Sequence, residues 1–414
     1  MFLGVGMKRI VLRGGVKLSG EISVSGSKNA ALPIIFSCIL TNGVSEIENL
    51  PNIGDVKVAL SLLKGFGAKI EKRGSQTFID TRSLTYVKPA PFLVTGIRAS
   101  TYLLGSCLSR FGICHIMPFG GCNFSLRPID MHIDACRALG GELQEDTLLC
   151  DRLLGGDIRF SKASVGATVN AILLAAAAEG ETHISGCAVE PHIDALICFL
   201  NSCGGNIRRQ GRELFIKGKE LHGGRIKVIG DMIEAGSYLA IGAMCGGRVR
   251  VNNIPDGDMD SIFDSFTDIG TQITRDESLA IVEQLSSGRF LSVTASPYPA
   301  FPTDLQPIFA PLMASASGGR ITDNVWHSRF GYLASLGSFG IRYEVQGNCA
   351  EIFKSKITNG ITAATDLRGG MACLIAALYA KGDSEIQHAD LILRGYENLE
   401  QKLRTLGAEI KICE

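Results

Sequence analysis

Apolar residues recur at helical spacing along this chain, and the stretches that carry them end at glycines. In the last stretch, Leu399, Leu403 and Leu406 share one face of a predicted helix, and residues 408–412 follow Gly407 as a predicted strand. Glycines that end such stretches occur six times, 64 to 73 residues apart: Gly67, Gly140, Gly204, Gly270, Gly340 and Gly407. This spacing predicts six related units, each with a helix that leads into strands.

A second series of stretches has the same period but is apolar on nearly every side. Residues 30–40, 165–178 and 371–380 are examples, and a helix without a polar face is expected to be buried all round. These stretches end at Gly43, Gly112, Gly180, Gly246, Gly318 and Gly382. Each unit is therefore predicted to hold one buried helix, one amphipathic helix and several short strands.

The number and spacing of the units predict an α/β protein of two pseudo-symmetric domains, with three units in each. A chain of 414 residues exceeds the roughly 250–300 residues at which single hydrophobic cores stop growing. The phase of the repeat divides the chain near residues 25–28 and again near residues 228–231. One domain is expected to comprise residues 1–27 plus 229–414, and the other, inserted, residues 28–228. An open solenoid is disfavoured because buried helices need neighbours on every side.

Composition and charge are those of an ordinary globular protein. Hydrophobic residues make up 46% of the chain and charged residues 20%, and the formal net charge is zero. We therefore expect no long-range attraction to nucleic acid or to a membrane surface, and no apolar run approaches the ~18 residues that span a bilayer. Thirteen cysteines without a C-x-x-C pair argue against a disulfide framework and a zinc site. They favour a reducing compartment, which we expect to be the cytoplasm.

The segment from Pro118 to Pro128 interrupts the repeat with two glycines, Cys122 and Arg127. An arginine stabilises a nearby thiolate, so Cys122 is a candidate nucleophile or acid. The alternative is a surface loop with an incidental cysteine.

Lys28 and Asn29 stand at the start of the buried stretch 30–40. The free amides and partial positive charge of a helix N-terminus, joined by a lysine, suit a phosphate or a carboxylate. Lysine near a helix start is also common without any ligand, so this segment alone is weak.

Several arginines lie beside small or apolar residues rather than among polar ones: Arg98, Arg329, Arg368 and Arg394. One such arginine is more often part of a structural ion pair, but four at matching phases of the repeat favour a shared anion with phosphate and carboxylate groups.

Asp304, after a proline turn, is either the N-cap of the next helix or a base that takes a proton from a substrate hydroxyl.

Together, five segments resemble the UDP-N-acetylglucosamine enolpyruvyl transferase family. They are residues 26–33, the Gly-Gly-Cys loop with residues 127–132, and residues 164–168, 302–304 and 394–396, in the family's order and spacing over essentially the whole chain. The resemblance implies two inside-out α/β barrels of three units each, with the active site between them. It implies transfer of the enolpyruvyl group of phosphoenolpyruvate to the 3′-hydroxyl of UDP-N-acetylglucosamine, with release of phosphate. This is the first committed step of peptidoglycan synthesis and needs no metal or cofactor.

The resemblance also implies a role for individual residues. Lys28 and Asn29 would hold phosphoenolpyruvate, whose charges would be neutralised by Arg127, Arg368 and Arg394. Asp304 would accept the proton of the sugar hydroxyl, and Cys122 would protonate the methylene carbon. Lys28 and Arg394 join these two as the catalytic set. The nucleotide sugar would be bound by Arg98, Pro128, Ile129, Asp130, Met131, Lys162, Ala163, Ser164, Val165, Asp304 and the backbone of Val325.

The chain departs from the family's pattern at several positions. The departures are an extra Phe119 before the loop glycines, Ser125 for glycine, Met232 for arginine, His327 and Ser328 for a Glu-Asn pair, and Leu391 and Leu393 for polar residues. They leave open a paralogue that binds UDP-N-acetylglucosamine without turnover. The sister transferase acting on shikimate 3-phosphate is a weaker alternative, because its lysine motif continues Ser-Lys-Ser and it lacks the loop cysteine.

Overall fold

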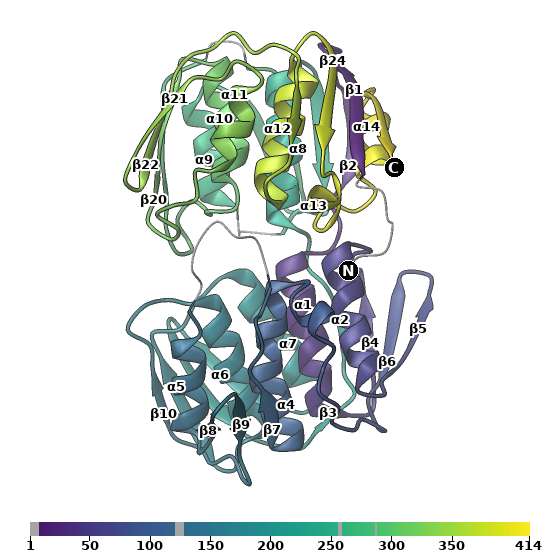
Figure 1. Cartoon of the computed structure of the whole chain (residues 1–414), viewed down its shortest axis with the longest axis vertical. Helices are drawn as coiled ribbons and strands as arrows, with labels where there is room; N and C mark the ends of the chain where they lie inside the picture. The colour runs from purple at the N-terminus through teal and green to yellow at the C-terminus, as the bar shows by residue number, and fades with distance from the viewer. Residues whose placement is uncertain (1–7, 121–127, 256–258, 286–287) are drawn as a thin grey trace. The chain divides into compact units, whose positions relative to one another are not determined.

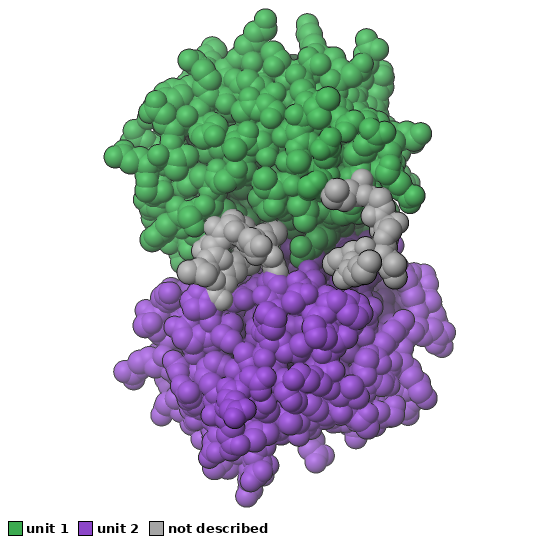
Figure 2. Space-filling view, viewed as in Figure 1, with its two compact units in different colours: residues 1–25, 122–125, 230–414 green, residues 26–121, 126–229 purple. Residues whose placement is uncertain are grey.

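A computed structural model describes residues 8–120, 128–255, 259–285 and 288–414. Contacts divide the chain into two compact units, coloured separately in Figure 2. Among the described residues, unit 1 holds residues 8–25 and 230–414, and unit 2 holds residues 26–120 and 128–229. Each unit has its own hydrophobic core.

Unit 1 contains three four-stranded sheets in its described part, and each sheet goes with one repeat. The sheet orders are β17-β18-β16-β2, β19-β20-β22-β21 and β23-β24-β1-β25. The strands are β1 (Arg9–Gly14), β2 (Gly20–Ser23), β16 (Arg248–Asn252), β17 (Ile273–Asp276), β18 (Leu279–Glu283), β19 (Leu291–Ala295), β20 (Gly319–Asp323), β21 (Tyr343–Gln346), β22 (Cys349–Ile352), β23 (Ile361–Ala363), β24 (Gly382–Gln387) and β25 (Glu409–Cys413). The helices are α8 (Met232–Cys245), α9 (Asp260–Asp268), α10 (Gln306–Ser315), α11 (Tyr332–Gly337), α12 (Leu367–Tyr379), α13 (Asp390–Leu393) and α14 (Leu399–Thr405).

Unit 2 repeats the arrangement with sheets β15-β4-β6-β5, β10-β11-β13-β12 and the shorter β7-β9-β8, plus the pair β14-β3. The strands are β3 (Thr41–Asn42), β4 (Val44–Glu48), β5 (Lys69–Arg73), β6 (Gln76–Asp80), β7 (Ile113–His115), β8 (Glu142–Gln144), β9 (Thr147–Leu149), β10 (Asp157–Arg159), β11 (Glu181–Ser185), β12 (Asn206–Gln210), β13 (Glu213–Lys217), β14 (Leu221–His222) and β15 (Arg225–Lys227). The helices are α1 (Lys28–Ser37), η1 (Cys38–Leu40), α2 (Gly54–Gly65), α3 (Pro91–Val94), η2 (Arg98–Tyr102), α4 (Leu103–Phe111), α5 (Asp130–Ala138), α6 (Val165–Ala177) and α7 (Pro191–Ser202).

The repeats interlock through strands that are distant in sequence. β2 lies parallel to β16, although all of unit 2 separates them along the chain. In the same way β15 lies parallel to β4, and β1 completes the last sheet between β24 and β25. In each unit, a sheet is therefore completed by a strand from a distant part of the chain.

The apolar helices fill the interior of each unit and the sheets lie outside them, as Figure 1 shows. In unit 1, α8, α10 and α12 pack against one another. Every residue of α12 from Leu367 to Leu378 is buried, which explains why this helix lacks a polar face. In unit 2, α4 packs against both α1 and α6. This is the inside-out α/β barrel fold that the sequence predicted.

The first glycine series ends the amphipathic helices as predicted. All six of its glycines have φ between +79° and +103°, the left-handed region that glycine enters at low cost. In the second series Gly43 is the exception. Because α1 continues into η1 and β3, Gly43 follows a strand, and its lack of a side chain is needed for close approach: a Cβ there would lie 2.6 Å from the amide nitrogen of Gly223. No helix of the described part is long and apolar enough to cross a membrane.

Candidate active site

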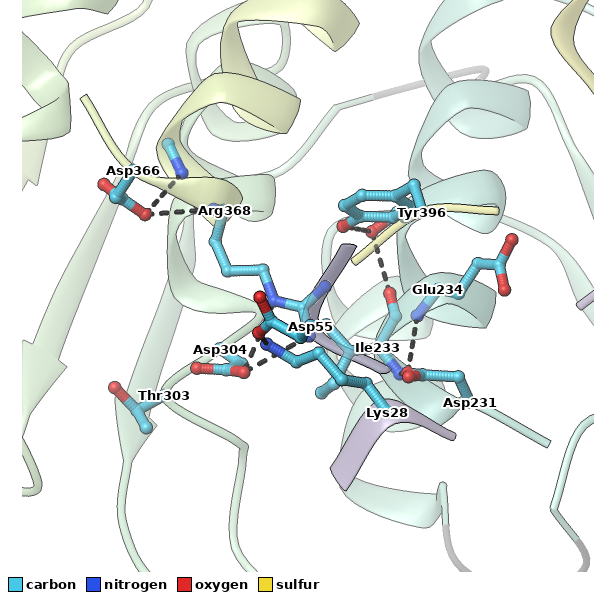
Figure 3. Close-up of polar contacts among 12 residues, drawn as sticks. Lys28, Asp55, Asp231, Ile233, Glu234, Thr303, Asp304, Asp366, Arg368 and Tyr396 are labelled. Carbon is cyan, nitrogen blue, oxygen red and sulfur yellow. Dashed lines mark hydrogen bonds and ion pairs between the residues drawn. The ribbon is translucent and has the colours of Figure 1, made fainter. Parts of the chain in front are cut away.

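In unit 1, the carboxylate of Asp304 is held by two buried arginines, Arg329 and Arg368, and Figure 3 shows the contact with Arg368. Its Oδ1 accepts a hydrogen bond from Nη1 of Arg329 at 2.7 Å, and its Oδ2 accepts from Nε and Nη2 of Arg368, each at 3.3 Å. The two arginines are only 4% and 1% exposed, and buried guanidinium groups require such a partner. The N-cap alternative is wrong, because α10 begins after Leu305 without a side-chain cap.

The backbone around Arg368 is fixed by the start of α12. Oδ1 of Asp366 caps this helix by accepting from the amides of Arg368 and Gly369 at 2.9 and 3.0 Å. The guanidinium carbon of Arg368 lies 5.4 Å from the centre of the Tyr396 ring, a cation–π arrangement. The Tyr396 hydroxyl is in turn hydrogen-bonded to that of Ser237 at 2.7 Å.

Arg368 keeps an unused donor. Its Nη1 is buried and has no hydrogen-bond partner within the described structure. Burial acts to lower the pKa of this guanidinium, but the neighbouring Tyr396 and Asp304 outweigh it and raise the pKa above the ordinary arginine value. A charged donor left unpaired in the interior is costly, so the site favours an anionic ligand oxygen at this nitrogen.

Arg394 is placed close to the start of α12 by the glycine that follows it. Arg394 directly follows α13 as its C-cap, and a Cβ on Gly395 would lie 2.7 Å from Cδ2 of Leu367. Only a residue without a side chain lets the two segments approach so closely. Unit 1 thus brings Asp304 and Arg368 into contact, and the residue after Arg394 lies against Leu367 at the start of α12.

In unit 2, Lys28 is the first residue of α1. Its Nζ forms an ion pair with Oδ2 of Asp55 at 3.4 Å, and the two side chains are 14% and 7% exposed. This pairing orients the Lys28 ammonium, which carries three donors, beside the amides at the helix start, where anions are stabilised.

Three other element ends of unit 2 carry the residues predicted for the nucleotide sugar. Arg98 begins η2, Asp130 begins α5, and Ser164 is the N-cap of α6, where its Oγ accepts from the amide of Ala167 at 3.4 Å. Lys162 is exposed just before α6. Anions are stabilised at helix N-termini, so these ends suit a diphosphate.

One buried amide, that of Asn170, joins these three ends. Its Oδ1 accepts from the amide of Gly105 at 2.6 Å, and its Nδ2 lies 3.2 Å from the carbonyl oxygens of Thr101 and Gly166. Nδ2 also lies 2.7 Å from Nδ1 of His132. Since Oδ1 faces a donor, Nδ2 must donate to the histidine, which places the ring proton of neutral His132 on Nε2.

His132 is held in the neutral state. Burial, followed by the nearby positive charge of Arg98, lowers the pKa of His132 to about 4, with Asp130 acting in the opposite direction. A Cβ on Gly166 would lie 2.8 Å from the histidine ring, so α5 and α6 meet closely here.

Comparison with known proteins assigns the chain to a family. Residues 12–403 match the family described as EPSP synthase (3-phosphoshikimate 1-carboxyvinyltransferase). A UDP-N-acetylglucosamine 1-carboxyvinyltransferase 3 of Caldanaerobacter subterraneus is 38% identical over 98% of this chain and 99% of its own length. A UDP-N-acetylglucosamine 1-carboxyvinyltransferase of Clostridium botulinum is also 38% identical, with the same coverage. The chain belongs to the UDP-N-acetylglucosamine 1-carboxyvinyltransferases of the EPSP synthase family.

Two solved structures share the fold of this carboxyvinyltransferase. The enolpyruvyl transferase NikO from Streptomyces tendae aligns with a TM-score of 0.87 at 24% identity and covers 99% of both chains. An EPSP synthase from Acinetobacter baumannii aligns with a TM-score of 0.74 at 18% identity, over 98% of this chain and 100% of that one.

Part of the site predicted for this carboxyvinyltransferase lies outside the described residues. Cys122 and Arg127 lie outside the described residues, while Pro128, Ile129 and Met131 lie on either side of the first residue of α5. Two of the apolar departures have a structural reason: Leu391 and Leu393 pack partly buried against the core of unit 1.

Sequence reasoning about this carboxyvinyltransferase missed the residues that hold the others in place. They are Asp55, His132, Asn170 and Asp323. Asp55 stands in the first turn of an amphipathic helix, where an acidic residue is expected for the helix dipole alone. Asn170 gave the clearest signal, because it is an amide side chain inside a helix whose other residues, apart from Thr168, are apolar.

Proposed function

We propose that this protein transfers the enolpyruvyl group of phosphoenolpyruvate to the 3′-hydroxyl of UDP-N-acetylglucosamine and releases phosphate, as the first committed step of peptidoglycan synthesis. The observation that carries the proposal is the Asp304 carboxylate clamped by Arg329 and Arg368. It is supported by relatives of this name over nearly the whole chain.

The reaction needs a base, an acid and cations, and we assign each to named residues. Asp304 takes the proton as the sugar oxygen bonds to C2 of phosphoenolpyruvate, and Cys122 delivers a proton to C3. Loss of phosphate and of a C3 proton from the resulting ketal restores the double bond on the sugar. Lys28, with the arginines, stabilises the charge on the departing phosphate.

The cations that bind phosphoenolpyruvate are proposed to be Lys28, Arg127, Arg368 and Arg394, with Asn29 beside them. The unused Nη1 donor of Arg368 supports an anion at that arginine. Carboxylate and phosphate oxygens form short, charge-assisted hydrogen bonds with guanidinium groups.

The nucleotide sugar is proposed to bind at the starts of η2, α5 and α6, with a further contact from the backbone of Val325. The residues assigned to it are Arg98, Pro128, Ile129, Asp130, Met131, Lys162, Ala163, Ser164 and Val165. The Ser164 cap and the Asn170 hydrogen bonds hold these helix starts in place, which lowers the ordering cost of binding.

We further propose that the protein works in the cytoplasm. All twelve cysteines in the described part are free thiols. Burial raises the pKa of several, among them Cys187, Cys203 and Cys245, each to about 12, so these thiols stay protonated. Free cysteines in such number suit a reducing compartment.

Phosphate release tests the proposal. Purified protein is mixed with phosphoenolpyruvate alone, with UDP-N-acetylglucosamine, and with shikimate 3-phosphate, the acceptor in the name of the matched family. Release that requires UDP-N-acetylglucosamine is the expected result. Release that requires shikimate 3-phosphate would replace the acceptor, and binding of UDP-N-acetylglucosamine without release would make the protein a binder.

A further inference from the structure

The carboxylate of Asp323 connects two parts of the proposed site in unit 1. Asp323 ends β20 and is fully buried. Its Oδ1 accepts from the amides of Val325 and Trp326 at 2.9 and 2.8 Å. Its Oδ2 accepts from the Thr303 hydroxyl at 2.6 Å. One carboxylate therefore spans two loops, each of which follows a strand of the parallel pair β19 and β20.

Through Thr303 this connection reaches Asp304. Nη1 of Arg329 donates to Oγ1 of Thr303 at 3.2 Å and to Oδ1 of Asp304 at 2.7 Å. Because the Thr303 hydroxyl donates its proton to Asp323, its lone pairs face Arg329. The result is a directed series of contacts from Asp323 through Thr303 and Arg329 to Asp304.

The loop that follows β20 is also held at Asp323. The amide of Asn324 donates to the carbonyl of Ala295 at 2.9 Å, and that of Asp323 to the carbonyl of Asn348. The amides of Val325 and Trp326, by contrast, bond to the Asp323 side chain. A buried carboxylate is stable only when its oxygens are satisfied, and here both loops supply the donors.

We propose that Asp323 is a positioning residue that sets the base Asp304 and the nucleotide-sugar contact Val325 in register with each other. This inference rests on the proposed function, because it depends on the roles proposed for Asp304 and Val325. Asp323 itself is assigned no substrate contact. One branch, through Thr303, orients Asp304 and so acts on the rate of proton transfer. The other branch holds the Val325 backbone and so acts on affinity for the nucleotide sugar.

Variants separate the two branches. Thr303→Val removes only the branch to Asp304, and Asp323→Ala removes both. Asp323→Asn keeps one oxygen for the amides but presents an NH2 group to Thr303, so it should behave like Thr303→Val. Asp264→Asn, at an exposed position of α9, is the matched control.

The expected kinetic pattern differs between variants. Thr303→Val and Asp323→Asn should lower kcat roughly 10- to 100-fold, as expected for a lost hydrogen bond to a charged group, with KM for UDP-N-acetylglucosamine within about twofold of wild type. Asp323→Ala should lower kcat similarly and also raise that KM roughly tenfold. The double variant Asp323→Ala, Thr303→Val should have the same kcat as Asp323→Ala, because both changes cut one series of contacts.

Other results would overturn the inference. Losses in kcat that multiply in the double variant, or a wild-type KM in Asp323→Ala, would show that Asp323 does not couple the loops. Hydrogen–deuterium exchange of residues 324–328 in the free protein gives a readout without turnover: Asp323→Ala should exchange faster there, and Thr303→Val should not. If the wild-type protein releases no phosphate, the proposed function fails, and unchanged exchange in Asp323→Ala would overturn the anchoring role separately.

Discussion

Asp304→Asn should cost this protein stability as well as activity. The change keeps the size of the side chain but removes the charge that faces Arg329 and Arg368. Active-site charges are often a burden on folding, so their removal commonly stabilises a protein. Here the opposite is expected, because two guanidinium groups that are 4% and 1% exposed would lose their shared counter-ion.

The size of the effect follows from these contacts. Removing one partner of a fully buried ion pair costs about 3–5 kcal/mol. The Asp304 side chain is 28% exposed, and asparagine keeps one oxygen for a guanidinium, so we expect about 1–3 kcal/mol. For a folding unit of this size, that lowers Tm by roughly 2–10 °C.

Calorimetric unfolding and phosphate release should be measured on the same preparations, with Asp264→Asn as the surface control. We expect a lower Tm together with a loss of phosphate release of at least about 100-fold, a size typical for removal of a general base. An unchanged or higher Tm would refute the reasoning about the two arginines. Turnover of Asp304→Asn close to that of wild type would show that Asp304 is not the base.

Three further predictions concern single residues. The pKa of His132 is lowered from 6.5 to about 4, so between these pH values the unfolded chain binds a proton that the folded chain does not. The free energy of unfolding should therefore fall by about 3 kcal/mol as the pH drops from above 6.5 to 4. Thermal unfolding measured against pH should show a shallower fall in His132→Gln. Asn170→Ala should weaken binding of UDP-N-acetylglucosamine roughly tenfold or more and lower Tm, in titration calorimetry and unfolding, whereas Asn206→Ala at an exposed position of β12 should change neither. Cys122→Ser should abolish inactivation by fosfomycin, which alkylates the loop cysteine in this family; unchanged inactivation would place the reactive group elsewhere.

The fold could be predicted from the sequence because its signals are local and repeated. Helices such as α12 are apolar on nearly every side, and the glycines that follow the amphipathic helices have the positive φ expected of them. The prediction that Gly43 directly ends a helix was wrong, because α1 is followed by the 3-10 helix η1 and the short strand β3 before Gly43. Periodicity does not distinguish a helix that ends from one that tightens.

The site could be predicted only as far as its residues resemble a motif. Asp304 and Arg368 were identified from sequence, but the contact between them joins residues 64 positions apart, and no local pattern indicates it. Asp323 and Asn170 act through backbone amides and carbonyls of other elements. Such contacts depend on how strands and helices pack, which a single sequence does not reveal.

Analysis of the reaction product shows directly whether the enolpyruvyl group is transferred to the sugar. Phosphoenolpyruvate and UDP-N-acetylglucosamine should be incubated with the protein, and the product examined by mass spectrometry and proton NMR. We expect a nucleotide sugar that has gained the enolpyruvyl group, with two vinyl protons and substitution at the 3′-oxygen. Unchanged UDP-N-acetylglucosamine accompanied by free pyruvate and phosphate would contradict it, because the protein would then hydrolyse the donor rather than transfer its group.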